Sequence, residues 1–237
     1  AGVSNYAIKI QKIEGVETFA GTTATLSFWA KADASKNIAV EFAQSFGTGG
    51  TNPAPSANVL GIGVTTVALT TSWVKHTVSV AIPSISGKTL GTNGNDYFQL
   101  LLWMDAGSTH NARTNSLGQQ SGTFEFSQVQ IEAGSVATEF EPRSVGEELD
   151  LCERYYETGD GNFWIYAASG SQPIWNMQFT TTKRAVPTIV MVKGGNNSFP
   201  NAATGYASTS TIKLGCGAKT GSGAANVLLT FKASAEL

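Results

Sequence analysis

The chain of 237 residues contains 26 glycines and only 14% charged residues, a composition typical of many short strands and turns. Its 15 basic and 17 acidic residues give a formal charge of −2, without the basic excess that nucleic-acid-binding proteins carry. No apolar run approaches about 18 residues, the length that a membrane span requires. We therefore expect no nucleic-acid partner and no membrane insertion.

Alternation of apolar and polar residues predicts a series of strands in the first part of the chain. In the run 97–105, one face is apolar and is expected to lie in the core. The opposite face mixes aromatic and polar side chains, namely Tyr97, Gln99, Leu101, Trp103 and Asp105. Further strands are expected at 6–13, 25–32, 38–43, 64–69, 73–82 and from Phe124 onward. This pattern predicts a β-sandwich, and a jelly roll is the topology that we expect.

After Pro142 the signal changes from strand to helix. Ser144 and Glu147 have the spacing of a capping box, and the helix that they open is expected to have about 10 to 12 residues. A helix of this length needs a surface to pack on, and another copy of the chain is one candidate. The apolar residues expected to contact such a copy are Leu149, Leu151, Cys152, Tyr155 and Tyr156.

The last part of the chain repeats the β pattern in fewer residues. Strands are expected at 163–168, 174–182, 188–193, 209–214 and 227–233. A sandwich of about 95 residues has a thin core, and oligomerisation is one way to bury more apolar surface. The fold class is therefore all-β, with a jelly roll at 1–141, a helical junction at 142–158 and a smaller C-terminal β-sandwich at 159–237.

Residues with catalytic or metal-binding chemistry are scattered along the chain. His76 and His110 lie in different predicted elements, without a carboxylate or thiol at metal-ligand spacing, and His76 is expected on a strand surface. Cys152 and Cys216 are too few for a disulfide framework and are expected to be buried thiols.

Glycoside hydrolysis requires two carboxylates placed across a bond. Glu41 and Asp105 could meet in space, although isolated, solvated acids are the simpler interpretation. No nucleophile motif of the G-x-S-x-G type is present. We therefore expect a protein that is not an enzyme and that has no cofactor.

Sugar binding makes smaller demands on the sequence. An aromatic ring stacks on the apolar face of a pyranose, while amide, carboxylate or guanidinium groups bind its hydroxyls. Trp103 and Trp29 are candidate platforms, although a tryptophan in a strand is often packed against its neighbours instead. The candidate ligand-binding residues are Trp29, Gln99, Trp103, Asp105, Asn111 and Arg113.

The junction around the predicted helix contains the segments VQIEAG at 129–134, ATEFEPR at 137–143 and ELDLCERYY at 148–156. Together they resemble the junction of many tailed-phage tail fibre and receptor-binding proteins. In those proteins a carbohydrate-binding-module-like jelly roll is followed by a C-terminal β domain that assembles as a trimer. LSFWAKA at 26–32 is similar to an early strand of the jelly roll, and KRAVPT at 183–188 to the strand opening of the C-terminal domain.

This resemblance implies a homotrimer that adheres non-covalently to host cell-surface polysaccharide and contacts other virion tail proteins. It also implies a place in the virion tail, after assembly in the host cytoplasm. A structural decoration or spacer of the virion, and a non-catalytic sugar-binding module of a depolymerase, are the alternatives. Jelly-roll modules of this kind often hold a structural calcium ion, for which Glu14, Glu17 and Glu132 are the candidate ligands.

Overall fold

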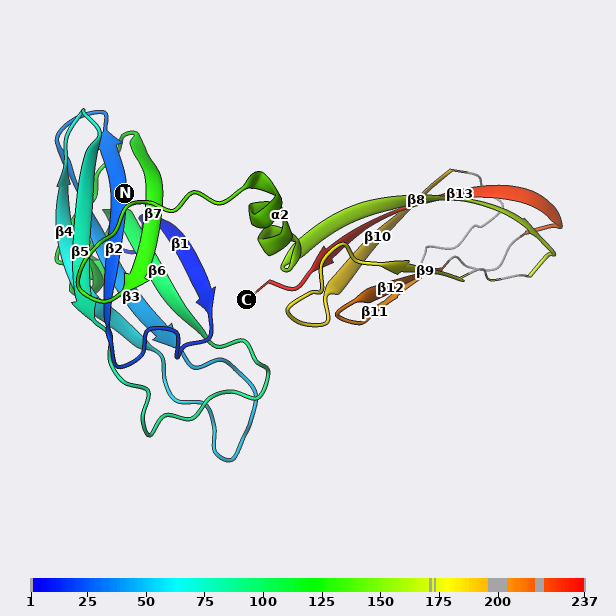
Figure 1. Cartoon of the computed structure of the whole chain (residues 1–237), viewed down its shortest axis with the longest axis horizontal. Coiled ribbons are helices and arrows are strands. Elements are labelled where there is room, and N and C mark those ends of the chain that lie inside the picture. Colours follow the sequence, from blue (N-terminus) through cyan, green and yellow to red (C-terminus); the bar gives the residue numbers. More distant parts are fainter. Residues whose placement is uncertain (1, 171, 173, 196–203, 216–219, 237) are drawn as a thin grey trace. The chain divides into compact units, whose positions relative to one another are not determined.

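The computed structural model describes residues 2–170, 172, 174–195, 204–215 and 220–236. The chain divides into two compact units, with the boundary between Glu141 and Pro142 (Figure 1). Strands dominate both units, and α2 is the longest helix among the described residues. No helix in this part of the chain is long and apolar enough to cross a bilayer.

The first unit is a sandwich of two antiparallel sheets. The four-stranded sheet has the order β1-β6-β3-β4, formed by β1 (Tyr6–Glu14), β6 (Tyr97–Ala106), β3 (Lys36–Ser45) and β4 (Val59–Leu69). The three-stranded sheet has the order β5-β2-β7, formed by β5 (Val74–Ala81), β2 (Thr23–Ala32) and β7 (Phe124–Ala133). The predicted jelly-roll sandwich is confirmed.

The core of this unit lies between the two sheets. Phe28 of β2, Phe42 of β3 and Phe98 of β6 are fully buried, and the Phe42 and Phe98 rings stack with centroids 5.5 Å apart. Leu100 and Leu102 continue the same face of β6. The alternation along 97–105 therefore predicted correctly which side of β6 is core.

The opposite, outer face of the four-stranded sheet is also covered. The segment after β6 folds over it as a short 3-10 helix, η1 (Ser108–His110), followed by one helical turn, α1 (Asn111–Thr114). Neither helix was expected. The small apolar cluster beneath them consists of Ala39, Ala43, Leu101, Trp103 and Ala106.

The second unit begins with α2 (Val145–Glu153). The predicted capping box is present, because Glu147 N–H donates to Ser144 Oγ and Ser144 N–H donates to the Glu147 carboxylate. The helix is shorter than expected and ends before Tyr155. Tyr156 opens the next strand instead, and the Ala235 N–H donates to the Tyr155 carbonyl at 2.7 Å.

A smaller β-sandwich forms the rest of the second unit, as expected. One sheet has the order β10-β13-β8, formed by β10 (Thr188–Gly195), β13 (Gly223–Ser234) and β8 (Tyr156–Ala167). The other has the order β11-β12-β9, formed by β11 (Thr204–Ala207), β12 (Thr211–Gly215) and β9 (Ile174–Gln178). Its buried cluster consists of Phe179, Ile212, Leu214, Leu229, Phe231 and Ala233.

Two features of this unit differ from the sequence expectation. The strand β11 was not expected, and the segment 183–187 precedes β10 rather than opening it. Lys183 in that segment is buried, with its ammonium paired to the Glu157 carboxylate and bound to the Glu153 carbonyl. The segment therefore supplies a buried ion pair that ties α2 and β8 together.

Candidate functional site

The buried carboxylate of Glu41 organises the outer face of the four-stranded sheet. Glu41 lies in β3, where the pairing with β4 is irregular on both sides of Phe42. The Gly61 N–H donates to Glu41 Oε1 at 2.7 Å, and the indole Nε1–H of Trp103 donates to Oε2 at 2.8 Å. Because the Glu41 side chain has no exposed surface, these bonds replace the hydration that burial removes.

Arg113 supplies the opposite charge. Its Nε–H donates to Glu41 Oε1 at 2.8 Å, and its guanidinium carbon lies 5.1 Å from the centroid of the Trp103 ring. The ion pair compensates the buried charge, and a cation over an indole face is itself favourable. Arg113 is therefore fixed by two interactions, while 29% of its side chain remains exposed.

Two more rings pack around Trp103. Ring centroids are 5.7 Å apart for Tyr6 and Trp103, 5.2 Å for His110 and Trp103, and 5.1 Å for Tyr6 and His110. Tyr6 nevertheless remains 56% exposed, so its ring is held in place while it still faces solvent. We call Tyr6, Glu41, Trp103, His110 and Arg113 the Arg113 cluster.

Tyr6 reaches this position because the N-terminal segment packs closely against Gly107. The Gly107 N–H donates to the Asn5 carbonyl at 2.8 Å, and the Thr109 N–H donates to the Val3 carbonyl at 3.1 Å. A Cβ on residue 107 would lie 2.2 Å from the Val3 oxygen, so this approach requires glycine.

The role expected for Trp103 is corrected by its burial. Its side chain is only 2% exposed and is occupied by Glu41 and Arg113, so it has no free ring face for stacking. Arg113, which was a candidate, lies directly beside it. Tyr6, which was not a candidate, carries the exposed ring.

The other candidates of the same sheet lie apart from the Arg113 cluster. Gln99 shares the outer face of β6, but it is four residues from Trp103, roughly 13 Å along a strand. Asp105 Oδ1 accepts the Gln120 N–H at 2.6 Å and so closes the loop after β6.

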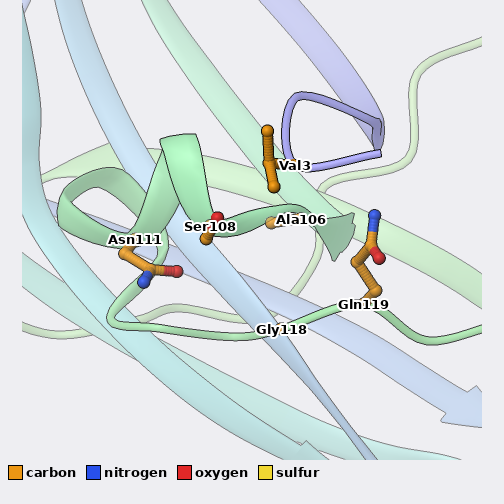
Figure 2. A pocket seen from close by; sticks show the side chains of 6 residues that line it. All are labelled: Val3, Ala106, Ser108, Asn111, Gly118 and Gln119. Carbon is orange, nitrogen blue, oxygen red and sulfur yellow. The ribbon is translucent and has the colours of Figure 1, made fainter. Parts of the chain in front are cut away.

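Asn111 lines a small pocket of about 270 Å³ between the N-terminal segment and the loop after β6. Figure 2 shows the Asn111 and Gln119 side chains on opposite sides of this pocket, with Val3 and Ser108 between them. The pocket lining also contains Ala106 and Gly118, neither of which offers a side-chain hydrogen-bonding group. Asn111 therefore marks a separate hollow near the Arg113 cluster.

Trp29 belongs to the other sheet and does not meet the remaining candidates. It lies in β2, paired with Lys75 of β5 and Ser127 of β7. Nearby, the Lys31 ammonium lies 5.2 Å from the Trp73 ring centroid and 3.0 Å from the Glu125 carboxylate. The predicted ligand-binding set is thus divided between the two faces of the sandwich.

The carboxylates considered for hydrolysis are not paired. Glu41 binds Arg113, whereas Asp105 binds the backbone of Gln120. Glu41 is also not the solvated acid of the simpler interpretation. The arrangement resembles a structural ion pair with one exposed end.

His76 and Cys152 differ from their sequence expectations. His76 is half-buried beside Phe28, with ring centroids 5.5 Å apart, and burial lowers the pKa of its imidazole. Its Nε2 is buried and has no hydrogen-bond partner. Cys152 is exposed rather than buried, and Cys216 lies outside the described residues.

The acidic residues proposed for calcium do not converge. Glu14 ends β1, whereas Glu132 lies in β7 of the other sheet and accepts hydrogen bonds from Thr138. Those bonds lower the pKa of the Glu132 carboxyl. Among the described residues, no three His, Cys, Asp or Glu side chains are grouped so that they could share a metal ion. These carboxylates do not fit a calcium site.

The residues expected at an oligomer interface are distributed over α2 and the start of β8. Leu149 and Leu151 are 54% and 46% exposed, and Tyr156 in β8 is 42% exposed. Cys152 is also exposed, whereas Tyr155 is half-buried. No residue of α2 is buried within the chain.

Comparison with known proteins finds only distant likenesses. No protein-family model and no curated protein matches the sequence. A solved structure described as "CBM4 structure and function" aligns with a TM-score of 0.31 and 21% identity, over 54% of this chain. The alignment spans 61% of that chain, less than two thirds of its length.

Two structures of discoidin II from Dictyostelium discoideum also align. The wild-type structure gives a TM-score of 0.26 at 7% identity over 99% of this chain and 78% of the other. The recombinant protein gives 0.25 at 9% identity over 97% and 77%. Likenesses of this strength assign neither a family nor a function to the chain.

Proposed function

We propose that the chain is a non-catalytic glycan-binding protein and that the Arg113 cluster is its sugar-binding surface. The observation that carries this proposal is the Tyr6 ring, 56% exposed yet held by two neighbouring rings. A sugar ring stacks on such a surface at little entropic cost, because the aromatic side chain is already ordered. Arg113 stands next to the same indole and offers N–H donors for sugar oxygens.

We further propose that the chain is part of a tailed-phage tail fibre that adheres as a homotrimer to host cell-surface polysaccharide. The junction segments at 129–134, 137–143 and 148–156 support this proposal through their resemblance to such fibres. The exposed apolar residues of α2 support an oligomer, because large apolar side chains exposed together favour contact with a partner. Three linked sites would raise a weak single-site affinity through effective concentration.

Replacing Tyr6 by Ala tests the sugar-binding surface. Binding of the full chain to purified host-surface polysaccharide should weaken roughly tenfold, which corresponds to about 1.4 kcal/mol. Isothermal titration calorimetry provides the measurement. Tyr166, 82% exposed in the second unit, provides the matched control, and Tyr166→Ala should bind as the unmodified chain does.

Two results would contradict the proposal in different ways. If Tyr6→Ala binds polysaccharide as tightly as the unmodified chain, the Arg113 cluster is not the binding surface. If the unmodified chain binds no polysaccharide, a structural spacer becomes the better account. Release of free sugars during the incubation would instead indicate an enzyme.

A further inference from the structure

We propose that the Arg113 guanidinium selects a sugar bearing a carboxylate, so that the ligand is a uronic-acid-containing glycan. The inference rests on the proposed sugar-binding surface and names the chemistry of its ligand. Of the three guanidinium nitrogens of Arg113, one donates a hydrogen bond within the described part of the protein and two remain available to a ligand.

Glu41 occupies one nitrogen of the guanidinium. The hydrogen bond to Glu41 is donated by Nε, at 2.8 Å. Among the described residues, the two terminal nitrogens, Nη1 and Nη2, have no hydrogen-bond partner, and no second carboxylate lies within ion-pair distance of Arg113. The end of the guanidinium therefore retains a pair of parallel N–H groups, the geometry that binds both oxygens of a carboxylate.

The buried end of the cluster keeps this pair of donors in place. Glu41 has no exposed surface and also accepts from Trp103 Nε1 and Gly61 N, so its own position is fixed from three sides. The cation–π contact with the indole, at 5.1 Å from the guanidinium carbon to the ring centroid, is a second interaction that holds the guanidinium in place. An arginine ordered in this way loses less conformational freedom on binding than a free surface arginine does.

The charge balance also allows an anion to bind. The negative charge of Glu41 is shared among three donors at the buried end, whereas the terminal nitrogens lie at the partly exposed end. Tyr6 and Arg113 both contact the same indole ring. The inferred arrangement places the sugar ring on Tyr6 and its exocyclic carboxylate on Arg113, the two residues that share this indole as a neighbour.

Matched pairs of oligosaccharides test this inference. The probes are galacturonate, glucuronate and mannuronate oligomers, each with its carboxyl-reduced neutral form and a sulfated neutral form. Binding to the full chain is measured by calorimetry at low salt and again at high salt. We expect at least one acidic oligomer to bind at least about tenfold more tightly than its neutral form, and the neutral form to retain weak binding.

Three variants identify the origin of that preference. Arg113→Lys keeps a cation for Glu41 but loses the planar pair of donors, and it should lose most of the preference for the acidic sugar. Glu41→Gln removes a negative charge and also removes the ion pair that holds the guanidinium in place. If Arg113 must be held in place to bind the carboxylate, this variant should bind the acidic sugar more weakly. Simple charge attraction predicts tighter binding instead. Lys9 provides a control. It is paired across the strands with Leu102, which faces the core, so it lies on the opposite side of the sheet from the Arg113 cluster. Lys9→Gln should therefore leave the preference for the acidic sugar unchanged.

The possible outcomes separate the two proposals. Equal binding of acidic and neutral forms overturns the carboxylate inference and leaves sugar binding intact. Tightest binding of the sulfated form, or tighter binding by Glu41→Gln with an unchanged melting temperature, also overturns it. A chain that binds no form of any pair overturns both proposals.

Discussion

Trp103 joins a buried hydrogen bond, a cation–π contact and two ring contacts in a single side chain. Its indole N–H is one of the three protein donors to the buried Glu41 carboxylate, beside the Gly61 N–H and Arg113 Nε–H. Burying a carboxylate without enough hydrogen-bond donors costs free energy. Trp103 therefore stabilises the fold by donating this hydrogen bond as well as by its apolar contacts.

Replacing Trp103 by Phe should therefore lower the free energy of unfolding of the first unit by about 1–3 kcal/mol, the cost of leaving a buried acceptor short of a donor. Chemical denaturation provides the measurement. Trp73 is 41% exposed, and Trp73→Phe should change the stability by less than about 0.5 kcal/mol. Equal losses of stability in the two variants would show that the hydrogen bond from the Trp103 indole N–H does not stabilise the first unit.

We expect His76 to make the stability of the first unit depend on pH. Because burial lowers the pKa of His76 in the folded state, the unfolded chain takes up a proton at a higher pH than the folded chain does. The stabilising contribution is complete above the unfolded pKa of about 6.5 and is lost as the pH falls towards the lower, folded pKa. The melting temperature should therefore fall between about pH 7.5 and 5.5, before most carboxyl groups titrate.

In a His76→Phe variant, the melting temperature should change less across the same range of pH. The added ring can pack against Phe28, whose centroid lies 5.5 Å from that of His76. An unchanged slope in this variant would assign the pH dependence to other groups.

At the scale of elements, the sequence predicted most of the long strands, found only the last part of β8, and missed the short pieces. Period-two alternation identifies β6, because ten residues give a clear pattern. The elements η1 and α1, with three and four residues, and β11, with four, are too short for any periodic signal. The end of α2 was misplaced because backbone bonds from Arg184 and Ala235, distant in sequence, terminate the helical pattern there.

The candidate site was predicted only in part, for a similar reason. Trp103 and Arg113 were identified by residue type, but the partner that joins them is Glu41, 62 and 72 residues earlier in the chain. Tyr6 reaches Trp103 through the pairing of β1 with β6 and the close approach at Gly107. No local pattern reports contacts over such separations.

The close approach of β4 to β5 requires a glycine at position 63. Gly63 has a φ of +61°, and a Cβ at this position would lie 2.2 Å from Val80 Cγ1. Gly63→Ala should therefore destabilise the first unit by about 1–3 kcal/mol, through both backbone strain and overpacking.

Gly87 provides a control that isolates the backbone term. Its φ is +74°, but no atom lies within 4 Å of the Cβ position. Gly87→Ala should cost less than Gly63→Ala, and adding Val80→Ala to Gly63→Ala should recover part of the difference. Denaturation curves that rank the two glycines equally would contradict the steric explanation.

At the scale of the whole molecule, both units expose apolar side chains, and in the second unit several of them share one sheet. Val190 and Val192 of β10 are 56% and 61% exposed, and Leu228 of β13 is 37% exposed. They line a shallow hollow of about 410 Å³ on one face of their sheet. This surface and the exposed side of α2 are the places where the proposed homotrimer would bury apolar area.

Light scattering after size exclusion should give three times the 24.8 kDa mass of one chain. Substituting Lys for Leu149 and Leu151 together should lower the mass, because a charge cannot be buried in an apolar contact without a large cost. Leu60 is 50% exposed in the first unit, and Leu60→Lys provides the control. A monomeric mass for the unmodified chain would contradict the homotrimer and, with it, the fibre.

The ion pair between Glu41 and Arg113 also constrains how the specificity of this surface could evolve. Arg113 lies in the short helical turn α1, in the connection between β6 and β7 at the surface, but its anchor is a carboxylate inside the sheet. A single change at position 113 to a neutral residue leaves that carboxylate without its counter-ion, whereas a change at both positions does not. Mutational drift towards neutral ligands would therefore pass through an unstable intermediate, and the two positions should show strong epistasis.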